Sequence, residues 1–281
     1  MRLRFDLGRA VRCADGLGRW FVAACVLSLA LAGPVRAAEA VCAAPRFLDQ
    51  VQLASLSGHV TRHEAVRVLA IGSSSTEGIG ASSPAAAYPQ QLEEDLSTAW
   101  RGTPVRVANA GIGGETASQT LARLERALTG PEKPDLVLWQ VGTNDAITGG
   151  DEAAFRAMVE RGIALVRAAG IDLVLIDQQY FPGIPDHARY ERFVGIVAAV
   201  AMQARVPVFS RYALMKDWNS QDPALLLSML SGDRFHMSDR GYDCLAEALS
   251  RGIVRASLPA AQTVARAKRP AVSDALPTRK G

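Results

Sequence analysis

The chain has 281 residues, of which 49% are hydrophobic and 21% charged, with a formal net charge of +3. This length and composition suit one large domain with flanking segments, and they supply enough apolar material for a sizeable core. The positive charge is concentrated at the two ends, so the part between them carries about five net negative charges, which excludes the electrostatic footprint of a nucleic-acid-binding domain.

Residues 1–38 have the features of a secretory signal peptide. Five arginines precede an apolar run from Trp20 to Ala32, which is too short for a stable membrane span. Small residues follow and offer cleavage sites at Val35–Ala37 and at Ala38–Ala40. An uncleaved membrane anchor is the alternative. We expect export to the periplasm or the medium, with no stable membrane anchor after cleavage.

The expected domain covers residues 65–257, after an N-terminal segment, residues 39–64, that has no strand or helix pattern of its own and is expected to pack on the domain. Apolar runs rich in Val, Leu and Ile predict strands at Val66–Gly72, Val105–Ala110, Leu136–Val141, Leu173–Ile176 and Val206–Phe209. The expected helices are Tyr88–Trp100, Ala117–Leu128, Glu152–Ala169, Ala188–Gln203 and Asp239–Arg251. Such alternation predicts a doubly wound α/β sandwich around a five-stranded, mostly parallel sheet. The basic tail, residues 258–281, is expected to be disordered.

Four polar or glycine-rich segments lie just after expected strands or just before the last helix. They are Gly72–Gly78, Asn109–Thr116, Gly142–Asp145 and Asp233–His236. Each segment alone is ordinary turn or cap chemistry. Ligands of an open α/β sheet bind beyond the carboxyl ends of its strands, where these segments are expected to meet. Together they supply a serine nucleophile, an imidazole base, a carboxylate to orient it, and amide donors for an oxyanion.

In this order the four segments resemble those of the SGNH, or GDSL, hydrolase superfamily over most of residues 66–250. On this resemblance Ser74 is the nucleophile, and His236 and Asp233 complete the triad. Gly114 and Asn144 form the oxyanion hole together with Ser74. The resemblance also implies a flavodoxin-like three-layer fold, no metal or other cofactor, and hydrolysis of ester or thioester bonds, often deacetylation of sugars.

The residue before the expected nucleophile departs from the family pattern, because Ser73 stands where the family has aspartate. That position is outside the triad, so we expect changed local hydrogen bonding and not a loss of chemistry. The main alternative is a non-catalytic, flavodoxin-like module that binds a phosphate-bearing ligand at Ser73–Thr76, since a helix N-terminus attracts anions. Such a module leaves Asn144 and the Asp233/His236 pair unexplained.

The histidines differ in their surroundings along the chain. His236 has a carboxylate three positions earlier in a segment expected to turn, which brings the two side chains within hydrogen-bond reach. His59 and His63 have the spacing of a ligand pair on a helix, but nothing beyond Glu64 offers a further ligand. We therefore predict no metal site.

Two cysteines, Cys42 and Cys244, remain once the leader is removed. In an oxidising compartment they predict a disulfide that attaches the N-terminal segment to the last helix. Two unrelated thiols are the alternative.

The sequence says less about the substrate than about the reaction. Trp139, Tyr180 and Phe181 lie at or near strand ends, where they either line the cleft or belong to the core. Export favours O-acetyl groups on cell-envelope or extracellular glycans, with lipid or short-chain esters as alternatives.

Overall fold

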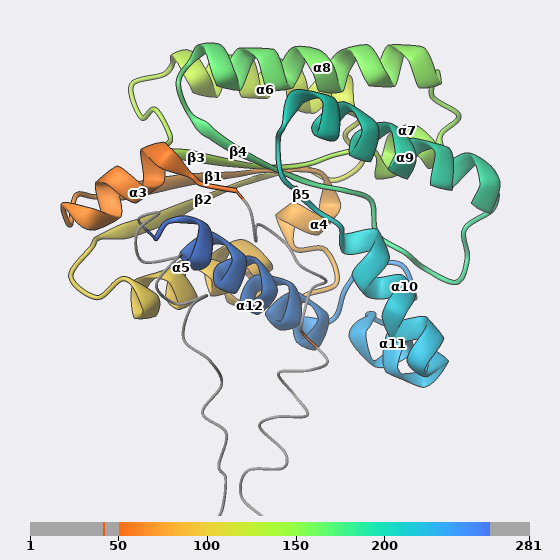
Figure 1. Ribbon diagram of the computed structural model, residues 1–281. Coiled ribbons are helices and arrows are strands. Elements are labelled where there is room, and N and C mark those ends of the chain that lie inside the picture. Colours follow the sequence, from red (N-terminus) through yellow and green to blue (C-terminus); the bar gives the residue numbers. More distant parts are fainter. Residues whose placement is uncertain (1–41, 43–50, 259–281) are drawn as a thin grey trace, which may run out of the picture. The chain divides into compact units, whose positions relative to one another are not determined.

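A computed structural model describes Cys42 and residues 51–258 of the chain (Figure 1). The structure does not describe residues 1–41, which include the expected signal peptide, nor residues 43–50, nor the tail beyond Leu258. Export and a disordered tail therefore stay predictions. Within the described residues, no helix is long and apolar enough to cross a membrane.

The fold is built on a five-stranded sheet in the order β2-β1-β3-β4-β5, in which every neighbouring pair is parallel. The strands are β1 (Val66–Gly72), β2 (Val105–Gly111), β3 (Leu136–Gln140), β4 (Asp172–Ile176) and β5 (Val208–Phe209). This strand order is flavodoxin-like and confirms the predicted α/β fold. The last strand is shorter than expected, because the Val206 N–H bonds to the Ala201 carbonyl oxygen of the preceding helix at 2.8 Å.

The expected helices form with shifted ends. They are α5 (Tyr88–Ala99), α6 (Ala117–Thr129), α8 (Glu152–Ala168), α9 (His187–Ala204) and α12 (Asp239–Ala256). The last helix continues past the expected end at Arg251, since its buried face extends to Ile253 and Ala256. Further helices were not predicted: α3 (Ala54–Thr61), α4 (Ser74–Glu77), α7 (Thr143–Ile147), α10 (Arg211–Gln221), α11 (Pro223–Met229) and the 3-10 turn η1 (Pro84–Ala86). The helix α3 corrects the expectation of a patternless segment over residues 39–64, and its Leu56 is fully buried.

The helices cover both faces of the sheet. Figure 1 shows α6, α8 and α9 on one face and α5 and α12 on the other. Trp139 is fully buried in the core between the sheet and the first group, where its indole N–H donates to Thr120 Oγ1 at 3.1 Å. Phe181 belongs to the same core, and Tyr180 packs against it partly buried. The two buried aromatics therefore serve packing and do not line a cleft.

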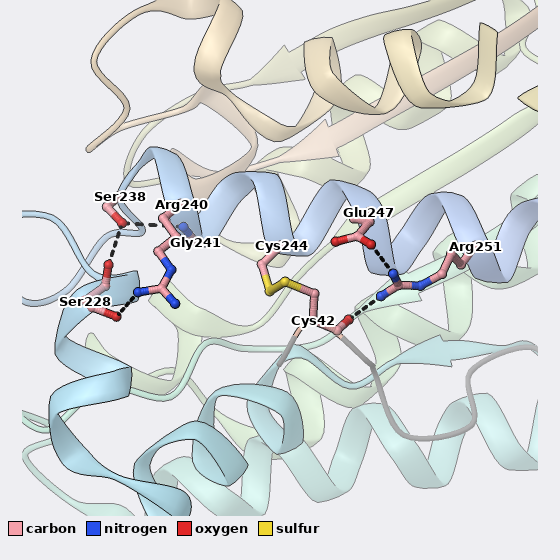
Figure 2. Close-up of a disulfide and its surroundings, with 8 residues drawn as sticks. All are labelled: Cys42, Ser228, Ser238, Arg240, Gly241, Cys244, Glu247 and Arg251. Atoms are coloured by element: carbon pink, nitrogen blue, oxygen red, sulfur yellow. Dashed lines mark hydrogen bonds and ion pairs between the residues drawn. A yellow bond between two sulfur atoms is a disulfide. The ribbon is translucent and has the colours of Figure 1, made fainter. Parts of the chain in front are cut away.

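A disulfide joins Cys42 to Cys244 of α12, with an S–S distance of 2.08 Å (Figure 2). The same stretch of chain is attached in two further ways. Arg251 donates to the Cys42 carbonyl oxygen at 2.6 Å, and the Leu53 N–H bonds to a carbonyl oxygen at the end of α12 at 3.0 Å. Cys42 and Leu53 are thus both fixed to α12, the helix that follows the His236 loop.

Candidate active site

Ser74 is the first residue of α4, and only Ser73 separates it from the end of the buried strand β1. Its carbonyl oxygen accepts the N–H groups of Gly78 at 3.0 Å and Ile79 at 2.9 Å, so the chain turns sharply after the strand. Gly78 ends this turn with a φ of 103°, a left-handed conformation that favours glycine. The Ser74 side chain is half-buried at the carboxyl end of β1. In this strand order, that is the switch point between β1 and β3, where ligands of such folds bind.

The three side chains predicted to act together form one hydrogen-bonded chain. The Ser74 hydroxyl lies 2.9 Å from His236 Nε2, and His236 Nδ1 lies 2.6 Å from Asp233 Oδ2. Both distances are those of good hydrogen bonds. A neutral imidazole that donates from Nδ1 to the carboxylate has Nε2 free to accept from the serine hydroxyl. The geometry therefore suits a base that can take the serine proton.

Asp233 is held by its own loop. Its Oδ1 accepts the Ser231 hydroxyl at 2.7 Å and the N–H groups of Phe235 and His236 at 2.9 Å each. Arg234 takes a left-handed φ of 57° to close this turn. Partial burial raises the pKa of Asp233, but hydrogen bonds from the His236 side chain, the Phe235 N–H and Ser231 outweigh it and hold the pKa well below its usual range. The carboxylate is therefore ionised and orients the imidazole.

The glycine-rich segment after β2 lies close to the nucleophile. A Cβ placed on Gly113 would lie 3.9 Å from the Ser74 Cβ. The Gly113 N–H itself is bound by Glu77 Oε2 at 2.6 Å. Gly114 has a φ of 78°, although a Cβ there would meet nothing within 4 Å. Glycine is required at this position by its backbone conformation and not by crowding.

Arg123 of α6 anchors the same segment. Its guanidinium donates to the carbonyl oxygens of Ala110 at 2.8 Å and Gly72 at 3.2 Å, and it pairs with the Glu115 carboxylate. Gly72 and Ala110 lie at the ends of the first two strands. One largely buried side chain thus ties both strand ends to the residue after Gly114. Sequence reasoning missed it, because an arginine on a helix is usually a solvated charge.

Asn144 lies in α7, which begins three residues after the end of β3, and is 8% exposed. Its amide nitrogen donates to the Glu115 carbonyl oxygen at 2.7 Å. An amide carries two N–H groups, so one remains for an oxyanion. Both oxygens of Asp145 accept the Ala117 N–H, at 3.0 and 3.1 Å. Burial raises the pKa of Asp145, although the hydrogen bond from Ala117 lowers it. These bonds bring the Gly114 segment and Asn144 together.

Ser73 fills the family's aspartate position with a compact hydrogen-bonding group. Its N–H and its hydroxyl both donate to Gln140 Oε1, at 2.8 and 3.1 Å, and Thr76 Oγ1 reaches the same oxygen at 3.3 Å. The hydroxyl of Ser75 also points inward and donates to Gln179 Oε1 at 2.7 Å. With these hydroxyls used inside the protein, the loop is poorly suited to cradle a phosphate.

The two histidines at helical spacing do not converge. His59 Nδ1 contacts the Ala65 carbonyl oxygen at 3.3 Å, whereas His63 Nδ1 contacts Thr103 Oγ1 at 3.2 Å. His63 lies beyond the end of α3 in a left-handed conformation. Across the described residues, no group of three or more His, Cys, Asp or Glu could hold a metal ion.

Comparison with known families agrees with this geometry. Residues 41–258 match the model of the Non-GDSL lipase-like family. The chain belongs to this family. The resemblance to SGNH/GDSL hydrolases expected from the four segments is thereby confirmed.

Two curated relatives are named as esterases. The chain is 36% identical over 110 residues to Esterase TesA of Pseudomonas aeruginosa, which covers 38% of this chain and 54% of the relative. It is 29% identical over 140 residues to the Arylesterase of Vibrio mimicus, and this alignment covers 48% of this chain and 68% of that relative. The first alignment thus spans about half the length of that relative. Both names support an ester hydrolase.

Solved structures extend the likeness to the fold. A crystal structure of TesA superposes with a TM-score of 0.56 at 26% identity, covering 66% of this chain and 97% of that chain. A two-domain esterase active on acetylated mannans gives a TM-score of 0.63 at 20% identity, and the match covers 83% of this chain and 60% of that chain. At this identity, the second match shows the fold alone.

Proposed function

We propose that the chain is an exported serine esterase in which Ser74 is the nucleophile, His236 the base and Asp233 its orienting carboxylate. The observation that carries the proposal is the hydrogen-bonded chain from Ser74 Oγ through His236 to Asp233, with links of 2.9 and 2.6 Å. It lies at the sheet edge where folds of this strand order bind ligands. The esterase names of the relatives support the same reaction class.

The reaction would proceed through an acyl-enzyme. His236 Nε2 takes the proton of Ser74 as Oγ attacks the carbonyl carbon, and the negative charge moves to the carbonyl oxygen. Backbone N–H groups of Ser74 and Gly114 and the free amide N–H of Asn144 are the proposed donors to that oxygen. His236 then protonates the leaving alcohol. Water, activated by the same imidazole, releases the acid and restores the serine.

Export is supported by two independent features. The first 38 residues read as a leader. Cys42, close to the expected cleavage site, is paired with Cys244. Disulfides persist in oxidising compartments and are rare in the cytosol, which favours a periplasmic or secreted enzyme.

Two substrate classes are proposed, and a structural observation favours the second. Export makes O-acetylated glycans the first candidate. The second is an ester with an apolar group, because three exposed isoleucines lie on the segments that carry the site. Ile79 is 42% exposed and follows Ser74 by a few residues. Ile112 is 46% exposed and shortly precedes Gly114, and Ile147 is 39% exposed and shortly follows Asn144. Exposed apolar side chains on the segments of a site are suited to contact an apolar part of a ligand.

A substrate panel tests the reaction and ranks the two classes. Mature protein is assayed with p-nitrophenyl esters of increasing acyl length and with acetylated sugars, beside Ser74→Ala as control. We expect Ser74-dependent hydrolysis of at least one ester. Rates that rise with acyl length favour the apolar class, and release of acetate from sugars favours the glycan class. Absence of Ser74-dependent hydrolysis across the panel contradicts the proposal.

A further inference from the structure

Gln179 lies between the turn that carries Ser74 and the loop that carries His236. It follows β4 at the carboxyl edge of the sheet and is 1% exposed. Its Oε1 accepts the Ser75 hydroxyl at 2.7 Å, and its Nε2 donates to the Phe235 carbonyl oxygen at 2.9 Å. Ser75 directly follows Ser74, and Phe235 directly precedes His236. One buried amide therefore joins the two segments that carry the Ser74–His236 hydrogen bond.

The contacts of this amide have a fixed sense, since its oxygen can only accept and its nitrogen can only donate. Ser75 supplies the donor on one side, and the Phe235 carbonyl supplies the acceptor on the other. The backbone of Gln179 is held too, because the Tyr190 hydroxyl donates to its carbonyl oxygen at 2.7 Å. Phe235 also packs edge-on against Phe181, with ring centroids 4.7 Å apart. The bridge thus starts from a rigid part of the core.

We propose that Gln179 is a positioning residue that sets the distance between Ser74 Oγ and His236 Nε2. The inference rests on the proposed function, because it concerns the proton transfer of that reaction. Gln179 does not reach the reacting atoms; it acts through Ser75 and Phe235. Proton transfer needs heavy atoms within about 2.6–3.2 Å, so loosening either segment slows the chemical step without changing substrate contacts.

The neighbouring residue offers a matched control. Gln178 is also fully buried, yet neither its amide oxygen nor its amide nitrogen has a hydrogen-bond partner within the described chain. The two side chains have the same size and burial and differ in their hydrogen bonds. Methionine replaces glutamine at similar volume. Gln178→Met therefore shows how much the exchange of a buried glutamine for methionine changes the kinetics when no bridging hydrogen bond is lost.

The test compares Gln179→Met with Gln178→Met in kcat, KM and the rate of labelling by a fluorophosphonate. We expect Gln179→Met to lower kcat and the labelling rate at least about tenfold with KM nearly unchanged, because the bridge affects the proton transfer alone. Gln178→Met should keep both rates close to those of the wild type. Equal rates in the two variants, or a loss in KM alone, overturn the positioning role. A wild type without Ser74-dependent hydrolysis overturns instead the proposed function.

Gln179→Glu gives a second readout that a change of stability alone would not move. A protonated carboxyl group keeps one accepting oxygen and one donating hydroxyl, whereas a carboxylate cannot donate to Phe235. Burial raises the pKa of a carboxyl group. We expect the ratio of the variant's kcat to the wild-type kcat to rise as the pH is lowered from about 8 to about 5. A ratio that does not change with pH contradicts the bridge.

Discussion

Ser74 and His236 are 162 positions apart in the chain, yet the serine hydroxyl lies 2.9 Å from His236 Nε2. The serine is placed by the end of β1, and the histidine by a loop that α12 follows. Their contact depends on how the sheet edge and the α12 region pack together.

Asn144→Ala should lower kcat by about 10²–10³ with little change in KM, because an oxyanion donor acts mainly on charge that develops in the transition state. The matched control is Asn219→Ala, a half-buried asparagine on α10 whose amide donates at 3.4 Å to Tyr180. Steady-state kinetics on the best ester of the panel measure both. A loss confined to KM would make Asn144 a substrate-binding residue instead.

Arg123→Met should lower kcat by about 10- to 100-fold, because small displacements of catalytic groups carry losses of this size. The arginine binds the carbonyl oxygens of Gly72 and Ala110 and pairs with Glu115, so its loss frees the Gly114 segment. Arg126→Met, at an exposed position on the same helix, is the control. If both variants retain full kcat, Arg123 does not support the oxyanion donors.

The Cys42–Cys244 disulfide should stabilise the fold. Cys42→Ser is expected to lower the free energy of unfolding, by about 4–5 kcal/mol at most in the chain-entropy model for a loop of this length. The kcat of the folded variant should stay near the wild-type value, since the hydrogen bonds that join Ser74, His236 and Asp233 do not involve Cys244. Urea unfolding with and without reductant provides the measurement. Full alkylation of both cysteines in unreduced, denatured protein from an oxidising compartment would contradict the bond.

Asp177 should make stability depend on pH. Burial raises the pKa of this carboxyl group to about 6, even though the Tyr212 N–H and the Ser210 hydroxyl bind it. An unfolded aspartate titrates near 3.9, so the folded state binds the extra proton between these values. The contribution of Asp177 to the free energy of unfolding is therefore fully present below about pH 4 and is lost as the pH rises through about 6.

Asp177→Asn removes this titration. Its unfolding free energy should fall less than that of the wild type between about pH 4 and about pH 7. The exposed Asp217→Asn serves as the control and should follow the wild-type curve. Parallel curves for Asp177→Asn and the wild type would show that Asp177 titrates alike in both states.

Much of the fold was readable from the sequence because its signals are local. Apolar runs bounded by glycine or polar turns predicted all five strands. Ligands of such sheets bind at the carboxyl ends of the strands, which placed four separate segments near one another. The helices α10 and α11 were missed for lack of a clear helical period, since α11 is short and mostly apolar and the buried residues of α10 include Arg211. Gln179 and Arg123 were missed for another reason. Their roles arise from partners 104 and 51 positions away, and no local pattern records such contacts.

The most direct test of the proposed triad is covalent labelling of the mature protein with a fluorophosphonate, followed by peptide mass spectrometry. A serine becomes reactive only where an adjacent base can take its proton. We expect one label, on Ser74 and not on Ser73 or Ser75, and a labelling rate that falls by orders of magnitude in His236→Ala. Labelling at another serine, or an undiminished rate in His236→Ala, would contradict it.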